Sequence, residues 1–259
     1  MSGTLTGIYR YPVKGLSAHQ LDRVLLTPGE TLPLDRAWAI ENGPSRFDAE
    51  NPRHLPKVAF LMLMRDDRLA SLDARFEEET SRLVLQRGGR QVASGDLTTR
   101  SGRQIVEQFM AAFMGPSLRG PPRIVTAPGH SFTDTPAKWL HVINLASVRD
   151  LERIVGRPID PLRFRPNLIV DGFEPWAEFA WIESEIGIGP AARLSVTART
   201  ERCAATNVDP KTGARDMDIP AVLQRKRGHS DFGVYAEVLS GGEIADGDPI
   251  TCEALVRSD

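Results

Sequence analysis

Two segments of the chain carry the hydrophobic spacing of an amphipathic helix. In both segments, apolar side chains recur three or four positions apart, and a glycine and a proline follow as a stop signal. The segments are residues 101–114, with Ile105, Phe109 and Phe113 on one face, and residues 147–155, with Val148, Leu151 and Ile154. We therefore predict a helix in each of these segments.

The other apolar residues form short stretches that alternate with polar residues or run without interruption, as β-strands do. Gly88-Gly89 separates two such stretches and predicts a hairpin, and the uninterrupted run 58–64 predicts a strand buried on both faces. Further strands are predicted at residues 168–170, 194–198, 232–239 and 250–256. Because 22 glycines and 19 prolines punctuate these short strands, the sequence predicts a mainly β protein with a few helices (α+β) and a barrel-like architecture.

A gap in this pattern predicts a domain boundary near residues 115–123. The segment contains Gly115-Pro116 and Gly120-Pro121-Pro122 and shows no apolar periodicity. We therefore divide the chain into residues 1–118 and 119–259. Residues 187–192 formally fit the G-x-G-x-x-A pattern of dinucleotide sites, but a strand-like stretch follows where a helix is required, so we interpret them as a turn.

Composition and charge narrow the class of protein. Of the 259 residues, 41% are hydrophobic and 25% are charged, which is typical of a globular domain. The net charge of −2 argues against a general nucleic-acid or anionic-membrane partner. The longest apolar run has seven residues, against roughly 20 for a membrane span, and the first fifteen residues show no signal-peptide pattern. We expect a soluble, cytoplasmic protein.

The two cysteines, Cys203 and Cys252, are too few for a disulfide framework or a four-thiolate iron–sulfur cluster. Cys203 follows a predicted strand and lies between Arg202 and a Thr/Asn/Asp turn. There a cation and turn amides would favour a thiolate that binds a soft metal or attacks an electrophile. A small buried hydrophobic side chain is an equal alternative for Cys203. Cys252 lies in the last apolar strand and His141 lies between two apolar residues, so we expect both in the core.

Three motifs in the second half of the chain occur together in one known family. They are F-R-P-N at residues 164–167, R-C-x-x-T-x-x-D-P-x-T-G at residues 202–213 and F-G-x-Y at residues 232–235. In this order they resemble a MOSC domain, the module named after the C-terminal part of molybdenum cofactor sulfurase, and are closest to its amidoxime-reducing branch. Residues 11–15 (Y-P-V-K-G) and 34–38 (L-D-R-A-W) resemble the β-barrel domain that precedes MOSC there. The resemblance implies two adjoining β-barrel-like domains, the second a MOSC β-barrel.

The resemblance also implies a molybdenum cofactor, a molybdopterin, bound by residues from both halves of the chain. Cys203 matches the cysteine that ligates molybdenum, and it is the expected catalytic and metal-binding residue. The positions expected to bind the pterin and its phosphate are Lys14, Arg36, Arg165 and Asn167, together with Arg202, Thr206 and Asp209 of the cysteine motif. Arginine and lysine supply charge-assisted donors to phosphate, and asparagine can pair with a pterin edge. Two departures from the family pattern are Gly15, where serine is usual, and Glu201, where a small residue is common.

By this resemblance the protein is an oxidoreductase that reduces N-hydroxylated or N-oxide-type substrates. The chain has no motif for an iron–sulfur cluster, haem or flavin, so the reaction implies a separate electron-transfer protein as a partner beside the small-molecule substrate. Two alternatives stay open. One is a non-redox carrier of sulfur or of the molybdenum cofactor, with a persulfide on Cys203. The other is a binding module associated with pyridoxal phosphate, for which Lys14 is the candidate Schiff-base lysine.

Overall fold

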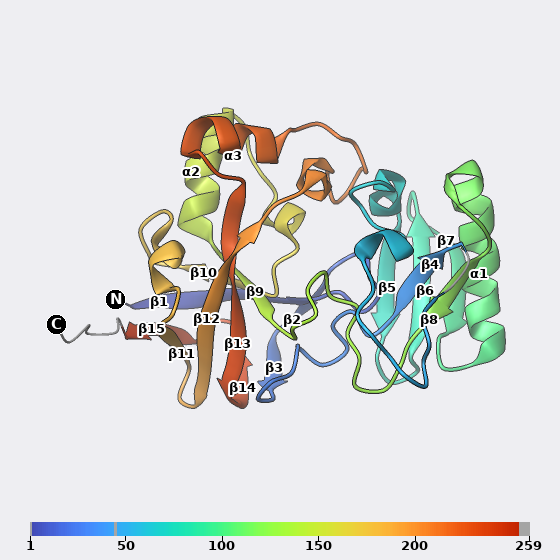
Figure 1. Cartoon of the computed structure of the whole chain (residues 1–259), viewed down its shortest axis with the longest axis horizontal. Helices are drawn as coiled ribbons and strands as arrows, with labels where there is room; N and C mark the ends of the chain where they lie inside the picture. The colour runs from blue at the N-terminus through green and yellow to red at the C-terminus, as the bar shows by residue number, and fades with distance from the viewer. Residues whose placement is uncertain (1, 44–45, 254–259) are drawn as a thin grey trace.

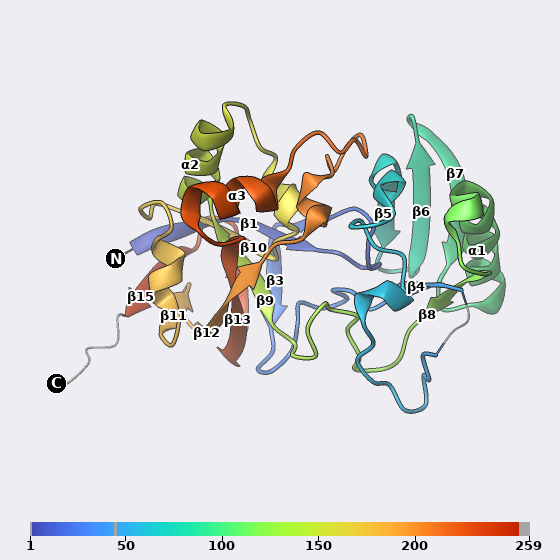
Figure 2. The same cartoon turned by 45° about the horizontal axis from the view of Figure 1, so that its top comes forward.

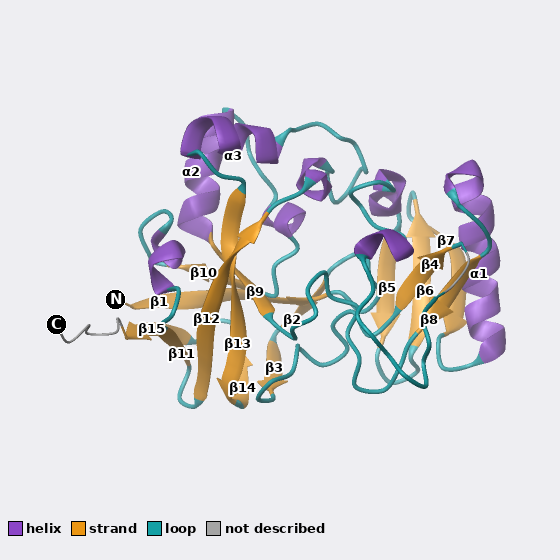
Figure 3. Ribbon diagram, in the orientation of Figure 1, coloured by secondary structure: helices purple, strands orange, loops and turns teal. Residues whose placement is uncertain are grey.

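The computed structural model describes residues 2–43 and 46–253 and shows two lobes side by side (Figure 1). The barrel lobe comprises residues 2–10, 19–26 and 140–253, and the small lobe comprises the described residues of 38–132 together with the loop at residues 13–16. Strands dominate both lobes and the helices lie at their periphery (Figure 3). The prediction of a mainly β protein with a few helices is confirmed.

Seven strands of the barrel lobe form a closed β-barrel. In ring order they are β10 (Leu168–Asp171), β9 (Leu140–Asn144), β13 (Asp231–Ser240), β12 (Ala192–Glu201), β11 (Glu185–Ile188), β15 (Pro249–Glu253) and β1 (Ser2–Arg10). The ring closes because β1 pairs with both β15 and β10, and only the β9–β10 pair of this ring is parallel. Outside the ring, β2 (His19–Leu21) pairs with β1, and β3 (Arg23–Leu26) pairs with β14 (Gly242–Ala245).

Alternating side chains of these strands fill the barrel. Leu194 and Val196 of β12 are fully buried, whereas Ser195 and Thr197 between and after them are partly exposed. Successive side chains of a strand point to opposite faces, so this burial pattern is the cause of the alternation seen at residues 194–198. The predicted strands at 168–170, 194–198 and 232–239 are confirmed, and the turn predicted at 187–192 is present at residues 189–191, between β11 and β12.

Two helices cover one end of the barrel lobe, α2 (Leu145–Val155) and α3 (Ile219–Arg227) (Figure 2). Both pack on a hydrophobic cluster that contains Phe164 and Phe232, whose rings are stacked with centroids 3.9 Å apart. The side chain of Asn144 caps α2 by accepting a hydrogen bond from the Ala146 N–H at 3.0 Å. No helix in the described part of the chain has the length and apolar content needed to span a membrane.

Among its described residues, the small lobe contains two sheets and one α-helix. A three-stranded antiparallel sheet consists of β5 (Asp73–Glu77), β6 (Arg82–Arg87) and β7 (Arg90–Asp96), and β4 (Ala39–Asn42) pairs with β8 (Pro122–Val125). The predicted hairpin at Gly88-Gly89 is the turn between β6 and β7. The helix α1 (Arg100–Met114) packs against β7. The lobe is therefore β-rich, although the strand pairings among its described residues form these two sheets rather than a closed ring.

Both predicted helices are present as α1 and α2, but α1 buries a different face from the one predicted. Val106 and Met110 are buried together with Phe113, whereas Ile105 is 50% exposed. The two alternatives share Phe113 and differ by a rotation of one residue, so the spacing of apolar residues fits both. Packing against the sheet decides between them.

Two further elements differ from the prediction. The strand predicted at 58–64 is wrong: the segment forms a 3-10 helix at Lys57–Ala59, a single bridge from Phe60 to Glu41, and then a turn. Phe60 and Leu61 are buried in two different hydrophobic clusters. The run is therefore apolar because this irregular segment packs against both clusters, and not because it forms a buried strand. The helix α3 was not predicted because only two of its nine residues, Ile219 and Leu223, are buried.

The sheets cross the predicted domain boundary at residues 118 and 119. The N-terminal strand β1 closes the barrel between β10 and β15, whereas β8, which follows the boundary, pairs with β4 of the small lobe. Each half of the chain therefore contributes strands to both lobes. The last predicted strand, 250–256, is present up to Glu253, and residues 254–256 lie outside the described residues.

Gly233 of the F-G-x-Y motif lies where β13 packs closely on β9. Its φ is 75°, and a Cβ atom there would lie 2.6 Å from the Val142 carbonyl oxygen. We expect Gly233→Ala to lower the free energy of unfolding by about 3 kcal/mol, because it adds both backbone strain and a collision. Urea denaturation measures the loss.

Gly228→Ala is the matched control, because Gly228 has a φ of 79° but open space where a Cβ would lie. It should cost about 1 kcal/mol, the effect of backbone strain alone. Equal losses in the two variants would contradict the close packing of β13 on β9.

Candidate functional site

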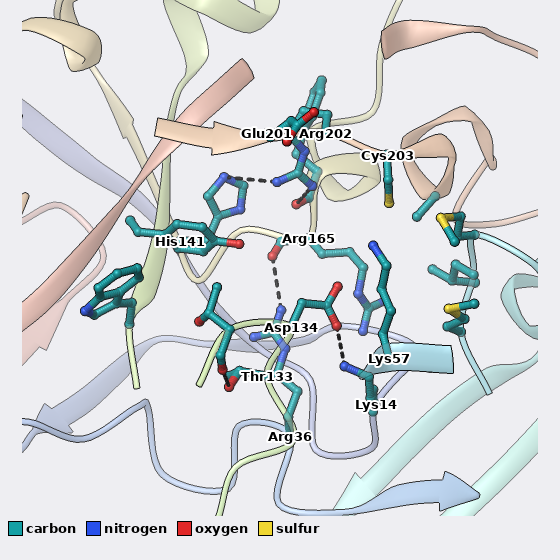
Figure 4. A pocket seen from close by; sticks show the side chains of 18 of the residues that line it. Lys14, Arg36, Lys57, Thr133, Asp134, His141, Arg165, Glu201, Arg202 and Cys203 are labelled. Atoms are coloured by element: carbon teal, nitrogen blue, oxygen red, sulfur yellow. Dashed lines mark hydrogen bonds and ion pairs between the residues drawn. The ribbon is translucent and has the colours of Figure 1, made fainter. Parts of the chain in front are cut away.

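A cavity of about 420 Å³ lies between the two lobes, at the end of β12 (Figure 4). Its walls come from both lobes and from the segment that connects them at residues 133–139. Six of the predicted site residues line it: Lys14, Arg36, Arg165, Asn167, Arg202 and Cys203. The fold thus brings together residues from the first and the second half of the sequence.

Cys203 lies just after β12 and begins a short 3-10 turn, Ala204–Asn207. The hydroxyl of Thr206 donates to the Cys203 carbonyl oxygen at 3.0 Å, and the Thr206 N–H donates to the same oxygen at 3.1 Å. These bonds fix the backbone of the turn, and the Cys203 thiol points into the cavity (Figure 4). The thiol is partly exposed, and it forms no disulfide with Cys252, which is partly buried against the barrel core. Cys203 is therefore available to a ligand in the cavity.

Lys14 brings a buried ammonium group to the cavity. It donates to the Phe132 carbonyl oxygen at 2.8 Å and forms an ion pair with Asp134. Burial lowers the pKa of Lys14, and the opposing effect of Asp134 only partly offsets this. Partial burial raises the pKa of Asp134, but the attraction of Lys14 outweighs that effect and lowers it to about 2. Both bonds occupy the amino group, which disfavours Lys14 as a Schiff-base lysine.

Two arginines, Arg36 and Arg165, stack on the buried ring of Tyr11. Their guanidinium carbons lie 4.5 Å and 4.0 Å from the ring centroid. Arg36 forms an ion pair with the buried Asp35 and donates to the Arg165 carbonyl oxygen at 3.4 Å, and Arg165 donates to the Leu16 carbonyl oxygen at 2.8 Å. Both guanidinium groups are therefore fixed in orientation before any ligand binds.

Burial affects the pKa values of the two arginines differently. Burial is the main cause that lowers the pKa of Arg165 to about 10; the charge of Arg36 acts in the same direction, whereas Tyr11 and the nearby carboxylates oppose it. For Arg36, burial also lowers the pKa, but Asp35 and the other neighbours more than compensate, so that the pKa is raised. Both side chains carry a positive charge at neutral pH.

Asn167 links two strands of the barrel. Its Oδ1 accepts from the His141 N–H at 3.1 Å, and its Nδ2 donates to the Tyr9 carbonyl oxygen at 3.1 Å. The same Oδ1 accepts from Arg36 at 3.4 Å. Asn167 thus ties β1 to β9 and orients Arg36, and its pairing with a pterin edge stays a prediction.

Arg202 and His141 form part of the wall on the barrel side. Arg202 donates to the Phe164 carbonyl oxygen at 2.6 Å and lies 3.5 Å from His141 Nε2. His141 is buried, as predicted, and it also lines the cavity. Burial and the charge of Arg202 hold the pKa of His141 well below its usual range, so its ring is neutral at pH 7. Burial lowers the pKa of Arg202 as well.

Thr206 and Asp209 do not line the cavity. Thr206 is fully buried and its hydroxyl binds the Cys203 backbone. Asp209 accepts from the N–H groups of Lys211 and Thr212 at 2.9 Å and 2.8 Å and forms an ion pair with Arg163 at 3.1 Å. Both residues shape the loop that carries Cys203, and a direct cofactor contact for them stays a prediction.

Positive charge accumulates around the cavity. Seven cationic side chains line it, namely Lys14, Lys57, Arg36, Arg163, Arg165, Arg199 and Arg202, against two carboxylates, Asp134 and Glu201. The excess of five positive charges (seven minus two) contrasts with the net charge of −2 for the whole chain. Because a concave site with low-dielectric walls focuses the field of its charges, the cavity attracts an anion to the vicinity of Cys203.

Sequence reasoning missed Lys57 and Asp134. Lys57 begins the segment 57–64, whose apolar run predicted a strand, and Asp134 belongs to no motif. Neither position lies in one of the motifs that indicated the site, so no local signal marked them.

The two departures from the family pattern have local explanations. Gly15 has a φ of 83°, a left-handed conformation that a serine would adopt only with strain. Glu201 is exposed at the edge of the cavity and accepts a hydrogen bond from the Ser230 hydroxyl at 3.3 Å. The Glu201 carboxylate is thus satisfied outside the group formed by Lys14, Arg36 and Arg165.

Arg215 joins the two lobes beside Cys203. On the small lobe it donates to the carbonyl oxygens of Leu63 and Met64 at 3.1 Å and 2.7 Å and to the Asp67 carboxylate at 2.7 Å. On the barrel lobe it donates to the Ala204 carbonyl oxygen at 3.1 Å. One guanidinium group therefore connects the turn of Cys203 to the opposite wall of the cavity.

Comparison with known families matches residues 129–251 to the MOSC domain. The matched segment contains the strands from β9 to β14 and the turn of Cys203. Residues 129–251 therefore match a MOSC domain, the module that the three motifs indicated.

Similarity to individual relatives extends beyond this domain. Mitochondrial amidoxime-reducing component 1 of Mus musculus is 24% identical over 286 aligned residues, which cover 96% of this chain and 82% of the mouse protein. Molybdenum cofactor sulfurase of Homo sapiens is 21% identical over 268 residues, which cover 89% of this chain but 29% of that protein. The crystal structure of the YUAD protein from Bacillus subtilis superposes with a TM-score of 0.46 and 13% identity, covering 96% of this chain and 94% of the other.

The Lys14–Asp134 pair predicts a pH dependence of stability. The pKa of Asp134 is lowered to about 2 in the folded protein, so its contribution is complete above the unfolded value of about 3.9 and is lost as the pH falls towards 2. In Asp134→Asn this contribution is absent and the buried Lys14 has lost its counter-ion. We expect the variant to be less stable than the wild type at pH 6, with a difference that shrinks between pH 4 and pH 2. Urea denaturation across this range measures it, and a constant difference would contradict the lowered pKa.

Arg215→Ala should loosen the turn of Cys203. Because the side chain is 34% exposed, we expect a loss of only about 1 kcal/mol in the free energy of unfolding. Amide hydrogen exchange at residues 203–208 and 63–67 should accelerate, since both segments lose the group that joins them. Arg215→Lys should behave similarly, because an ammonium group cannot serve acceptors on both lobes at once. Arg225→Ala, an exposed site on α3, is the control, and unchanged exchange in the Arg215 variants would refute the link.

Proposed function

We propose that the protein is a molybdenum-cofactor-dependent oxidoreductase that reduces N-hydroxylated or N-oxide-type small molecules. The observation that carries this proposal is one cavity that holds an accessible thiol, Cys203, beside a group of oriented cations. The similarity to an amidoxime-reducing component over 96% of the chain supports the reaction class.

The residues of the cavity fit a molybdopterin. Cys203 supplies a thiolate, the type of ligand that soft metals prefer. Lys14, Arg36 and Arg165 supply charge-assisted donors for a phosphate group, and their orientations are set by Asp134 and by the Tyr11 ring. Anchoring a dianion with preoriented cations avoids the cost of ordering flexible side chains on binding.

When bound, the cofactor supplies two-electron chemistry at the oxygen atom that the substrate loses. Each reduction of an N-hydroxylated substrate consumes two electrons and two protons and releases the oxygen as water. We propose that a separate electron-transfer protein of the cytoplasm supplies these electrons. In this arrangement Cys203 holds the metal, Lys14, Arg36 and Arg165 hold the phosphate, and the neutral His141 closes the wall without adding charge.

Cys203→Ser tests the proposal. The protein should be produced in a host that makes molybdenum cofactor, and molybdenum content and benzamidoxime reduction by an artificial reductant should be measured. We expect activity to fall by about 100-fold or more, because a hydroxyl is a harder and much less acidic ligand than a thiol. The free energy of unfolding should change by no more than about 1 kcal/mol, since the substitution hardly alters packing.

Cys252→Ser is the matched control, because Cys252 packs against the barrel core and does not line the cavity. It should keep its molybdenum and its activity. Wild-type activity in Cys203→Ser would exclude Cys203 as the metal ligand. A wild-type protein that binds molybdenum and reduces no N-hydroxylated compound would favour the non-redox carrier instead.

A further inference from the structure

Lys57 differs from the other cations of the cavity in its partners. Each of the other six has a carboxylate or a carbonyl oxygen within its reach: Lys14 has Asp134, Arg36 has Asp35, Arg163 has Asp209, Arg165 has the Leu16 carbonyl, Arg199 has Asp231 and Arg202 has the Phe164 carbonyl. Among the residues that the structure describes, the ammonium group of Lys57 has no hydrogen-bond or ion-pair partner. It is a cation without a counter-ion on the wall of an anion-attracting cavity.

Hydrogen bonds fix the backbone around Lys57, whereas its ammonium group has no partner among the described residues. Its carbonyl oxygen accepts from the Phe60 N–H at 3.1 Å, and Phe60 packs edge-to-face on Phe132 with ring centroids 5.3 Å apart. Arg119 binds the carbonyl oxygen of the next residue, Val58. The small lobe therefore presents the Lys57 side chain to the cavity from a fixed base, and Figure 4 shows it extending into the cavity that the Cys203 thiol enters from the barrel lobe.

The field of Lys57 reaches groups on two other parts of the wall. It contributes to lowering the pKa of Asp134, on the segment that connects the lobes, and it opposes the rise in the pKa of Tyr235, on β13. A negative group placed between these walls would therefore interact with Lys57. Of the two carboxylates that line the cavity, Asp134 is paired with Lys14, and Glu201 is exposed and accepts a hydrogen bond from the Ser230 hydroxyl.

We infer that Lys57 is a specificity-determining residue that selects substrates with a carboxylate or a similar anionic group. The inference rests on the proposed function, in which Lys14, Arg36 and Arg165 serve the cofactor and leave Lys57 for the substrate. The substrate class is then an N-hydroxylated small molecule that also carries a carboxylate, with the N–O group directed to the metal that Cys203 would hold and the carboxylate directed to Lys57. The residue acts in binding, so its effect belongs in KM rather than in kcat.

A pair of matched substrates tests this role, benzamidoxime and 4-carboxybenzamidoxime, which differ only in the carboxylate. In Lys57→Ala we expect KM for the carboxylate compound to rise about five- to ten-fold, with kcat and the KM for benzamidoxime within about two-fold of wild type. Lys57→Arg should restore most of the affinity. Glu201→Gln should act in the opposite direction and lower KM for the carboxylate compound, because it removes a like charge from the rim.

Lys226→Ala is the matched control for net charge, because Lys226 is an exposed lysine of α3 outside the cavity. It should leave both KM values unchanged. The preference of the wild type for the carboxylate compound should also weaken at about 0.5 M salt, since screening reduces the attraction. Equal changes for both substrates in Lys57→Ala, or none, would overturn the inference.

Calorimetric binding of the same two compounds to wild type and Lys57→Ala separates this inference from the proposed function. If the wild type reduces neither compound, the proposed function fails. Tighter binding of the carboxylate compound by the wild type, abolished in Lys57→Ala, would still establish Lys57 as the anion site. Equal binding of both compounds by the wild type would overturn that site whatever the activity.

Discussion

The burial of several positive charges between the two lobes is the constraint on which the arrangement of the site depends. A buried ion without a partner costs several kcal/mol, so each buried cation of the cavity requires its own compensation. The protein meets this requirement with few carboxylates: Asp35 serves Arg36, Asp134 serves Lys14, and the Tyr11 ring and the Leu16 carbonyl serve Arg165. Because carbonyl oxygens and an aromatic face stabilise charge without cancelling it, the cavity keeps its positive field.

That solution depends on the closure of the barrel by the N-terminal strand. β1 pairs with β10 and β15, and the chain leaving β1 places Tyr11 and Lys14 at the end of the barrel where Cys203 lies. Asn167 fixes the same junction by bonding to β1 and β9 at once. The shared site of the two halves of the sequence therefore follows from one non-local strand pairing.

Local patterns in the sequence predicted local structure, and the remainder depended on non-local contacts. The hairpin at Gly88-Gly89 and the strand at 194–198 are confirmed because turn residues and alternation act within a few positions. The pairing of β1 with β10 leaves no such signal, so the boundary placed at residue 118 cut across the sheets. The apolar run at 58–64 concealed Lys57, because residues that pack an irregular segment look like a buried strand. The motifs identified Cys203 and four cations of the cavity. They did not distinguish residues that line the cavity from Thr206 and Asp209, which shape the loop that carries Cys203.

The loop that carries Cys203 explains why the cysteine motif spans residues 202–213. Its first residues expose the Cys203 thiol and close the turn through Thr206, and its later residues fold back through the Asp209 carboxylate. The chain then reaches Arg215, which binds the carbonyl oxygens of Leu63 and Met64 on the small lobe. The thiol is thus held from both sides, by β12 of the barrel and by a bridge to the opposite wall. A relative movement of the lobes would displace the thiol and the cations together, which makes the contact between the lobes part of the site itself.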